Sequence, residues 1–229
     1  MKRNFVSAGA VAALVVMGMA LSPAPVLAVP TSIINFSINT PTAGTISYNG
    51  SGGPLVGSGI IVDTIQGLPA GLPLACGGCT LSFNTGNFTG FTAATWTFAS
   101  GGFIKITGAF APAGIGPGST LLSGIFTSPT TVLDIGSQLK ISGGTIFDTK
   151  NPLLDAYYGF PAGQQFRGAL ALHFVSSASP PHGFTSNPTL AGSVVNTPIP
   201  EPASLLLLGS GLLGLAAYGR KKIKNMVNS

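Results

Sequence analysis

Charged side chains are scarce in this chain of 229 residues. Lysine and arginine total 10 and aspartate and glutamate total 5, so charged residues make up 7% of the sequence, against roughly 25% in an ordinary soluble domain. So low a charge excludes the highly charged class of disordered proteins. The length allows one domain or two small ones.

Groups that carry enzyme chemistry are equally scarce. No Gly-x-Ser-x-Gly elbow precedes a helical pattern, and two cysteines supply only half of a zinc site. Between Val29 and Pro198 the acidic residues are all aspartates, which leaves few candidates for paired-carboxylate catalysis. Asp148 and Asp155 could offer oxygens to Ca²⁺, but their spacing does not match an EF-hand, and we expect a solvated loop there. We therefore expect no enzyme activity and no cofactor or metal.

The net charge of +5 comes from the two ends of the chain. In the middle, four basic residues balance four acidic ones: Lys105, Lys140, Lys150 and Arg167 against Asp63, Asp134, Asp148 and Asp155. A nucleic-acid-binding protein would carry its basic patch on the folded domain, so we expect no nucleic-acid partner. Basic residues beside apolar segments are instead typical of membrane topology.

Residues 1–28 have the layout of a secretory signal peptide. Lys2 and Arg3 precede an apolar run from Phe5 to Leu21, and two prolines then interrupt it. Val26-Leu27-Ala28 places small residues where signal peptidase requires them, which predicts cleavage between Ala28 and Val29. An uncleaved membrane anchor is the alternative, against which the short apolar run and the prolines argue.

A second apolar segment runs without charge from Ala203 to Gly219. As a helix it would be roughly 25 Å long, which is short but workable for crossing a hydrocarbon core of about 30 Å. Four cations follow it: Arg220, Lys221, Lys222 and Lys224. Since basic residues stay on the cytoplasmic side, this pattern predicts a single span that leaves the preceding domain outside the cytoplasm. A buried helix is the alternative, but this one has no polar face.

Pro200-Glu201-Pro202 stands directly before that span. The three-part order of tripeptide, apolar span and cation cluster, over residues 200–224, resembles the PEP-CTERM sorting signal of Gram-negative bacteria; residues 225–229 are a short tail. Ile199 stands where valine is common in that signal. The resemblance implies processing by an exosortase, a membrane-embedded cysteine-dependent protease or transpeptidase. It also implies an association with exopolysaccharide and biofilm.

Residues 29–178 predict an all-β ectodomain, an antiparallel β-sandwich or jelly-roll-like fold. Trp96 and Phe98 alternate with Thr95 and Thr97, and Phe166, Leu170, Leu172 and Phe174 share one face of a further segment. Such period-two alternation, punctuated by glycine and proline, is typical of half-buried antiparallel strands. Residues 179–199, rich in serine, proline, asparagine and threonine, are predicted to be a linker that lifts the domain off the membrane.

Both cysteines belong to the sequence Cys76-Gly77-Gly78-Cys79. Outside the cytoplasm a local disulfide is favoured, and the glycines allow so small a loop to close. Catalytic redox chemistry, metal binding and free thiols are the alternatives; no helical pattern follows the motif, as it would in a redox enzyme.

We therefore expect an exported surface or matrix protein without enzyme activity, with an exosortase and a membrane as partners. Exopolysaccharide or other glycans are further expected partners, because hydroxyl-bearing residues dominate the outward strand positions. The alternative is a secreted carbohydrate-binding module or carbohydrate-active enzyme. A cleft with two carboxylates, or a row of exposed aromatic residues, would favour that alternative.

Overall fold

The computed structural model describes residues 33–39, 43–68, 71–176, 178–186, 189–199 and 211. This part of the chain is nearly all antiparallel β-sheet, which confirms the predicted fold class. The strands are β1 (Ile33–Ile38), β2 (Thr45–Tyr48), β3 (Pro54–Leu68), β4 (Leu74–Phe91), β5 (Thr95–Phe98), β6 (Gly101–Phe110), β7 (Ile115–Phe126), β8 (Thr130–Asp134), β9 (Gln138–Gly143), β10 (Thr145–Lys150), β11 (Gln165–Val175), β12 (Phe184–Ser186) and β13 (Thr189–Pro198). Two short helical turns join them, η1 (Ala111–Ala113) and α2 (Pro152–Tyr157).

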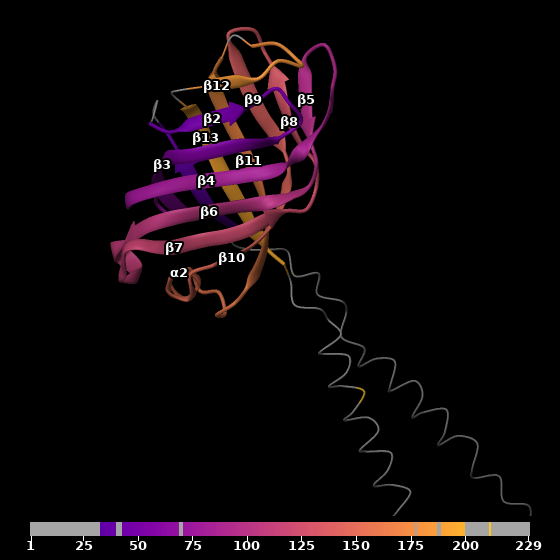
Figure 1. The fold of residues 1–229 in the computed structure, drawn as a ribbon. Coiled ribbons are helices and arrows are strands. Elements are labelled where there is room, and N and C mark those ends of the chain that lie inside the picture. The colour runs from indigo at the N-terminus through magenta and orange to yellow at the C-terminus, as the bar shows by residue number, and fades with distance from the viewer. Residues whose placement is uncertain are drawn as a thin grey trace, which may run out of the picture.

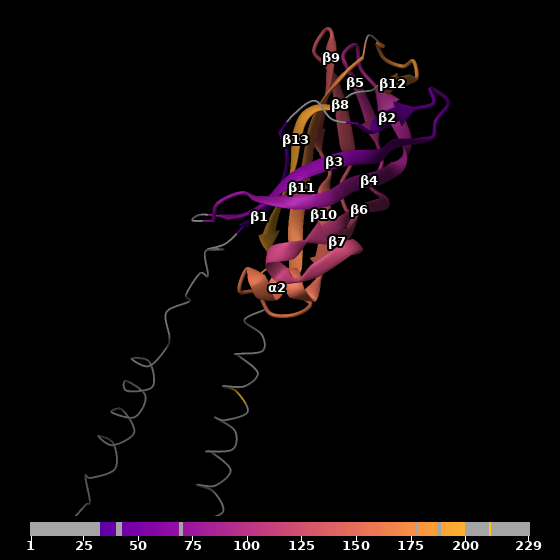
Figure 2. The same cartoon turned by 90° about the vertical axis from the view of Figure 1, so that its left-hand side faces the viewer.

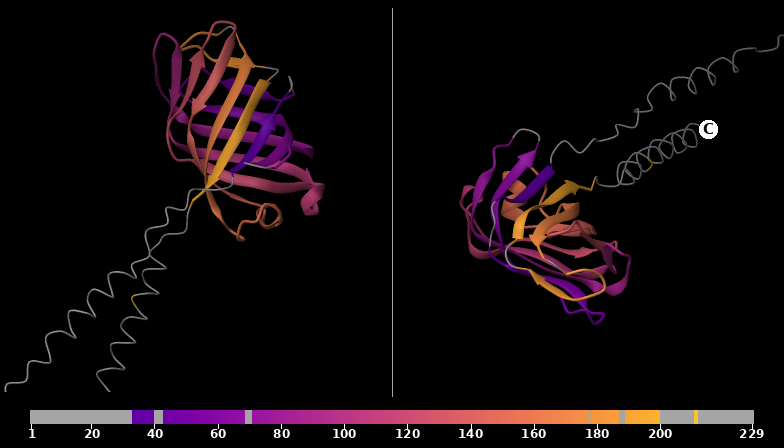
Figure 3. Two further views of the ribbon diagram at one scale, coloured as in Figure 1. Left: turned by 180° about the vertical axis from the view of Figure 1, so that it is seen from behind. Right: turned by 90° about the horizontal axis from the view of Figure 1, so that it is seen from above.

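The strands form one sheet that folds back on itself. Its order is β10-β7-β6-β4-β5-β8-β9-β11-β13-β1-β3-β2-β12, and β10 also pairs with β11 while β4 also pairs with β3. The pairings therefore lead from β10 through β7, β6, β4, β3, β1, β13 and β11 back to β10. In Figure 1 the layer of β3, β4, β6 and β7 crosses in front of β8, β9, β11 and β13. Figure 3 shows the second layer from behind and the strands surrounding the core from above.

The core lies between these two layers and follows the predicted alternation. On β11, Phe166, Leu170, Leu172 and Phe174 are buried, while Arg167 is exposed and His173 is partly exposed. Trp96 and Phe98 on β5 are buried as well. Full burial of each large apolar side chain stabilises the fold by about 1.5–3 kcal/mol.

Residues 179–199 do not form the predicted linker. β12 pairs with β2, and β13 lies between β1 and β11, with Asn196 opposite both Ile34 and Gly168. The buried indole of Trp96 donates a hydrogen bond from Nε1 to the backbone oxygen of His182 across 3.1 Å. The polar composition gave a wrong prediction because β13 is held largely by backbone pairing. Among its residues whose burial is described, Val194 and Asn196 are the buried ones, and one of the two is polar.

Cys76 and Cys79 are joined by a disulfide across a bulge in β4, with their Cα atoms 5.5 Å apart. Val62 of β3 faces Cys79 and Thr64 faces Ala75, so the residues between the cysteines form the bulge. Gly78 adopts a φ of 60°, a conformation that glycine takes without strain. Cys79 is buried, and Gly108 of β6 leaves room for it: a Cβ at that position would lie 2.6 Å from the Cys79 Cα.

Within the described residues, no helix is both long enough and apolar enough to cross a membrane.

Candidate functional site

The chain leaves the sheet at Ile199, directly after β13. The Ile199 amide donates a hydrogen bond to the Gln165 backbone oxygen across 2.9 Å. The side-chain amide of Gln164 donates to the Ile199 oxygen across 2.8 Å. The residue before Pro200 is therefore held on both its N–H and its C=O. No linker separates Pro200 from the folded domain.

A buried charged cluster lies near this exit, where β10 meets α2. Lys150 Nζ donates to Asp148 Oδ1 across 2.6 Å, and both side chains are inaccessible to solvent. Nζ also lies 3.5 Å from the centre of the Phe166 ring, in cation–π geometry. Asp155, from the first turn of α2, is fully buried as well. The sequence prediction of a solvated loop around Asp148 and Asp155 is wrong.

Glycines on both neighbouring strands leave room for the Asp148 side chain. A Cβ at Gly124 of β7 would lie 2.6 Å from the Asp148 Cβ, and one at Gly168 of β11 would lie 3.1 Å from Asp148 Oδ2. Within the described part of the chain, Asp148 Oδ2 and Asn196 Oδ1 have no hydrogen-bond partner. Buried oxygens without partners cost free energy.

Burial shifts the titration of all three charged groups toward their neutral forms. It raises the pKa of Asp155 from 3.8 to about 6, against the opposing attraction of Lys150. It lowers the pKa of Lys150 from 10.5 to about 8, although Asp148 and Asp155 raise it. It also raises the pKa of Asp148, with Lys150 again opposing. Since the side chains of Asp148, Lys150 and Asp155 are buried, the shifts in their pKa make the stability of the fold depend on pH.

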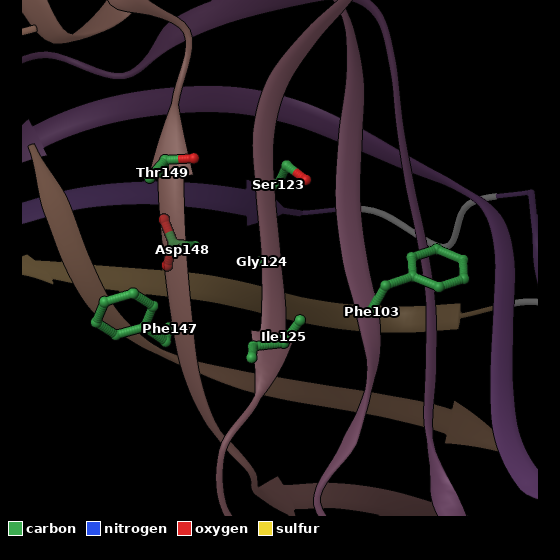
Figure 4. A pocket seen from close by; sticks show the side chains of 7 residues that line it. All are labelled: Phe103, Ser123, Gly124, Ile125, Phe147, Asp148 and Thr149. Carbon is green, nitrogen blue, oxygen red and sulfur yellow. The ribbon is translucent and has the colours of Figure 1, made fainter. Parts of the chain in front are cut away.

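A row of exposed apolar side chains crosses the outer face of β6, β7 and β10. Phe147 lies opposite Ile125 across the β10–β7 pair, and Phe103 stands on β6 beyond Ile125. Their exposed fractions are 36% for Phe147, 52% for Ile125 and 46% for Phe103. Figure 4 shows the three side chains along this face, where they line a shallow hollow with Ser123, Gly124, Asp148 and Thr149.

Cations and polar groups border the row of Phe147, Ile125 and Phe103, which we call the aromatic row after its two phenylalanines. Arg167 lies opposite Phe147 on β11, and Asn84 lies opposite Phe103 on β4. The neighbouring register positions hold Lys105 and Ser123, which face each other across the β6–β7 pair. The arrangement therefore offers ring surfaces for stacking together with charged and hydroxyl groups for hydrogen bonding.

Comparison with known proteins identifies the segment behind β13. Residues 198–222 match the family model described as the PEP-CTERM protein-sorting motif. The C-terminal segment is a PEP-CTERM protein-sorting motif. Neither a curated protein nor a solved structure matches the chain. The resemblance found in the sequence is confirmed, and the motif supports an exported protein that is targeted to an exosortase.

Most of the predicted site residues lie outside the described residues. They are Ala28 and Val29 at the predicted cleavage point, Pro200, Glu201 and Pro202 of the PEP-CTERM motif, and Arg220, Lys221, Lys222 and Lys224 of the predicted cytoplasmic anchor. Their roles remain predictions. What the structure adds is the fixed position of Ile199, next to the motif's first proline.

Two features escaped the sequence interpretation. The charged cluster was missed because Asp148, Lys150 and Asp155 surround a proline and so resembled a loop. Its one usable signal was period two: Ile146, Asp148 and Lys150 alternate with Phe147 and Thr149, which places both charges on the inner face. The aromatic row was missed because its members come from three strands whose register no local pattern specifies.

Proposed function

We propose that this chain is an exported surface or extracellular-matrix protein without enzyme activity. A single span over residues 203–219 holds it in the membrane until an exosortase acts at Pro200-Glu201-Pro202. The observation that carries the proposal is the PEP-CTERM motif, whose match begins at Pro198, the last residue of β13. The motif supports targeting to the exosortase; transient anchoring and the absence of catalysis are our inference.

The chemistry of the tripeptide suits a processing signal better than a structural element. Proline has no amide N–H and disfavours helical geometry in the residue before it, so the strand and the following span are both interrupted here. Glu201 supplies the only charge between Arg167 and Arg220. Anchoring by itself needs only the apolar span and its cations. An extended backbone with one carboxylate is suited to recognition by a protease.

The test is replacement of Glu201 in a host that has a matching exosortase. Glu201→Gln should leave export and folding intact while unprocessed, membrane-bound protein accumulates. Asp63→Asn is the matched control, because it also removes one carboxylate, from β3. Cell fractionation and intact mass give the readout. A wild-type protein that keeps its whole C-terminus, or equal processing of both variants, contradicts the proposal.

A second candidate function, binding of a polysaccharide, is favoured by the aromatic row. Phe103 and Phe147 present flat apolar rings, and Lys105 and Arg167 beside them favour an acidic chain over a neutral one. We propose that this face attaches the processed protein to an acidic exopolysaccharide.

Co-sedimentation with purified acidic and neutral polysaccharides tests the second candidate. Phe103→Ala combined with Phe147→Ala should reduce binding to the acidic chain at least tenfold. The matched control combines Phe91→Ala and Val175→Ala, which remove two exposed apolar side chains elsewhere. Unchanged binding by the first pair, or an equal loss in both pairs, excludes this face as the glycan site.

A further inference from the structure

One end of the domain gathers both points at which the chain enters and leaves the sheet. β1 begins where β13 ends, since Ile34 pairs with Asn196. The β3–β4 hairpin lies at the same end, because Ile33 faces Leu68. α2 joins it there, as Tyr158 donates a hydrogen bond from its hydroxyl to the Ile65 oxygen. In Figure 2, β1 begins between the β3–β4 hairpin and α2. We call this region the exit end.

The surface of the exit end is apolar and almost without charge. Residues 67–75 and 111–118 carry no charged side chain, and residues 151–164 carry only the buried Asp155. Leu72 is 80% exposed, Leu153 54% and Tyr157 44%. Leu153 and Tyr157 stand four residues apart on α2 and so share one of its faces. Tyr157 also contacts Phe110, which links α2 to the β6–β7 hairpin.

The length of the connection decides what this end faces. Ile199 is hydrogen-bonded to the sheet, and the apolar span starts at Ala203. Four residue steps reach at most about 14 Å. The headgroup layer alone occupies roughly 5–8 Å on each side of the hydrocarbon. A domain tethered this closely meets the membrane with the end from which the tether leaves.

We infer that the exit end docks on the lipid surface while the protein is anchored, with Leu72, Leu153 and Tyr157 in the headgroup region. The inference rests on the anchoring span of the proposed function. Tyrosine is enriched at membrane interfaces, where its ring and its hydroxyl meet different surroundings. The far end exposes apolar residues too, among them Phe91, Ile135 and Val175. The position of the tether therefore selects the lipid-facing end, and apolar exposure by itself does not.

The experiment measures the depth of one introduced tryptophan at a time in the full-length protein. Leu72→Trp and Tyr157→Trp replace exposed side chains at the exit end, and Phe91→Trp is the matched control at the opposite end of β4. Each protein is reconstituted into phosphatidylethanolamine–phosphatidylglycerol vesicles with or without bromine in the acyl chains. The parent protein, which retains only the buried Trp96, provides the background. We expect bromolipid to quench the tryptophans at positions 72 and 157 at least twofold more than the one at position 91.

Flotation of the same vesicles separates the two proposals. Protein that floats while the tryptophans at positions 72 and 157 stay unquenched overturns the docking and leaves the anchor intact. Protein that does not float overturns both. Equal quenching at all three positions shows a domain lying on its side and contradicts the exit end as the contact surface. Emission changes that follow protein density and not bromination indicate contact between copies, which also overturns the inference.

Discussion

The backbone amide of Ile199 donates a hydrogen bond to the backbone oxygen of Gln165 across 2.9 Å, and this bond closes the β11–β13 ladder immediately before Pro200-Glu201-Pro202. The next residue, Pro200, has no amide N–H, so the ladder cannot continue through it. The motif therefore starts at a fixed point on the surface of the sheet. An enzyme that binds an extended peptide there has to approach within a few residues of folded structure.

Lengthening this junction should accelerate processing. Insertion of Gly-Ser-Gly-Ser between Ile199 and Pro200 moves the motif away from the sheet, and we expect a severalfold faster loss of the C-terminal segment in a pulse-chase experiment. The same insertion after Gly136, in the exposed β8–β9 turn, is the control and should leave the rate unchanged. An unchanged rate for the first insertion indicates that the folded domain does not limit access to the motif.

Asp155 should make the protein less stable as the pH rises from about 4 to 6. Its pKa is raised from 3.8 to about 6 in the folded state, so the folded protein binds the proton more tightly than the unfolded chain in that window. The free energy of unfolding falls as the proton is lost. Asp155→Asn should remove this part of the fall and make the protein about 1–3 kcal/mol more stable than the parent at pH 7. Urea unfolding at several pH values measures the free energy of unfolding of both proteins. If the two plots of this free energy against pH run parallel, the prediction is contradicted.

Lys150 and Asp148 should be strongly coupled in stability. Lys150→Met leaves the Asp148 carboxylate buried without its cation, which we expect to cost about 3–5 kcal/mol. Adding Asp148→Asn removes the uncompensated charge and should recover more than half of that loss. Chemical denaturation of the two single variants and the double variant gives the coupling free energy. Additive effects would show that the ion pair does not couple the two residues.

Gly108 should be needed next to the disulfide. Gly108→Ala places a Cβ 2.6 Å from the Cys79 Cα, a conflict with backbone that forces β4 and β6 apart. We expect a loss of about 1–3 kcal/mol. Gly116→Ala in the β6–β7 hairpin is the control, since a Cβ there meets nothing within 4 Å. Thermal unfolding compares the two, and equal midpoints contradict the packing argument.

Local sequence patterns were sufficient to predict a strand where one of its faces carries large apolar side chains. On β11, Phe166, Leu170, Leu172 and Phe174 are separated by two or four residues, so they share one face and predict a half-buried strand. On β5, Trp96 and Phe98 do the same. The sorting motif was equally readable, because its three parts are contiguous in sequence.

The position of β13 in the sheet and the burial of Asp148 depend on contacts between segments that are distant in the sequence. Among the β13 residues whose burial is described, Val194 is the one fully buried apolar side chain, and the strand is paired through its backbone with β1 and β11. Asp148 can be buried because Gly124 and Gly168, 24 and 20 residues away, leave it space. Neither fact is expressed in the residues around the segment itself.

The position of β13 between the first strand and β11 has a consequence for the order of events during export. A chain that is translocated from its N-terminus delivers β13 last, and until then the edges of β1 and β11 that it covers stay unpaired. Unpaired edges invite pairing with other chains. The ring of strands can close only when residue 199 has emerged, which is also when Pro200 follows it. Completion of the sheet and presentation of Pro200-Glu201-Pro202 should therefore coincide, and we expect an exosortase to meet a folded domain.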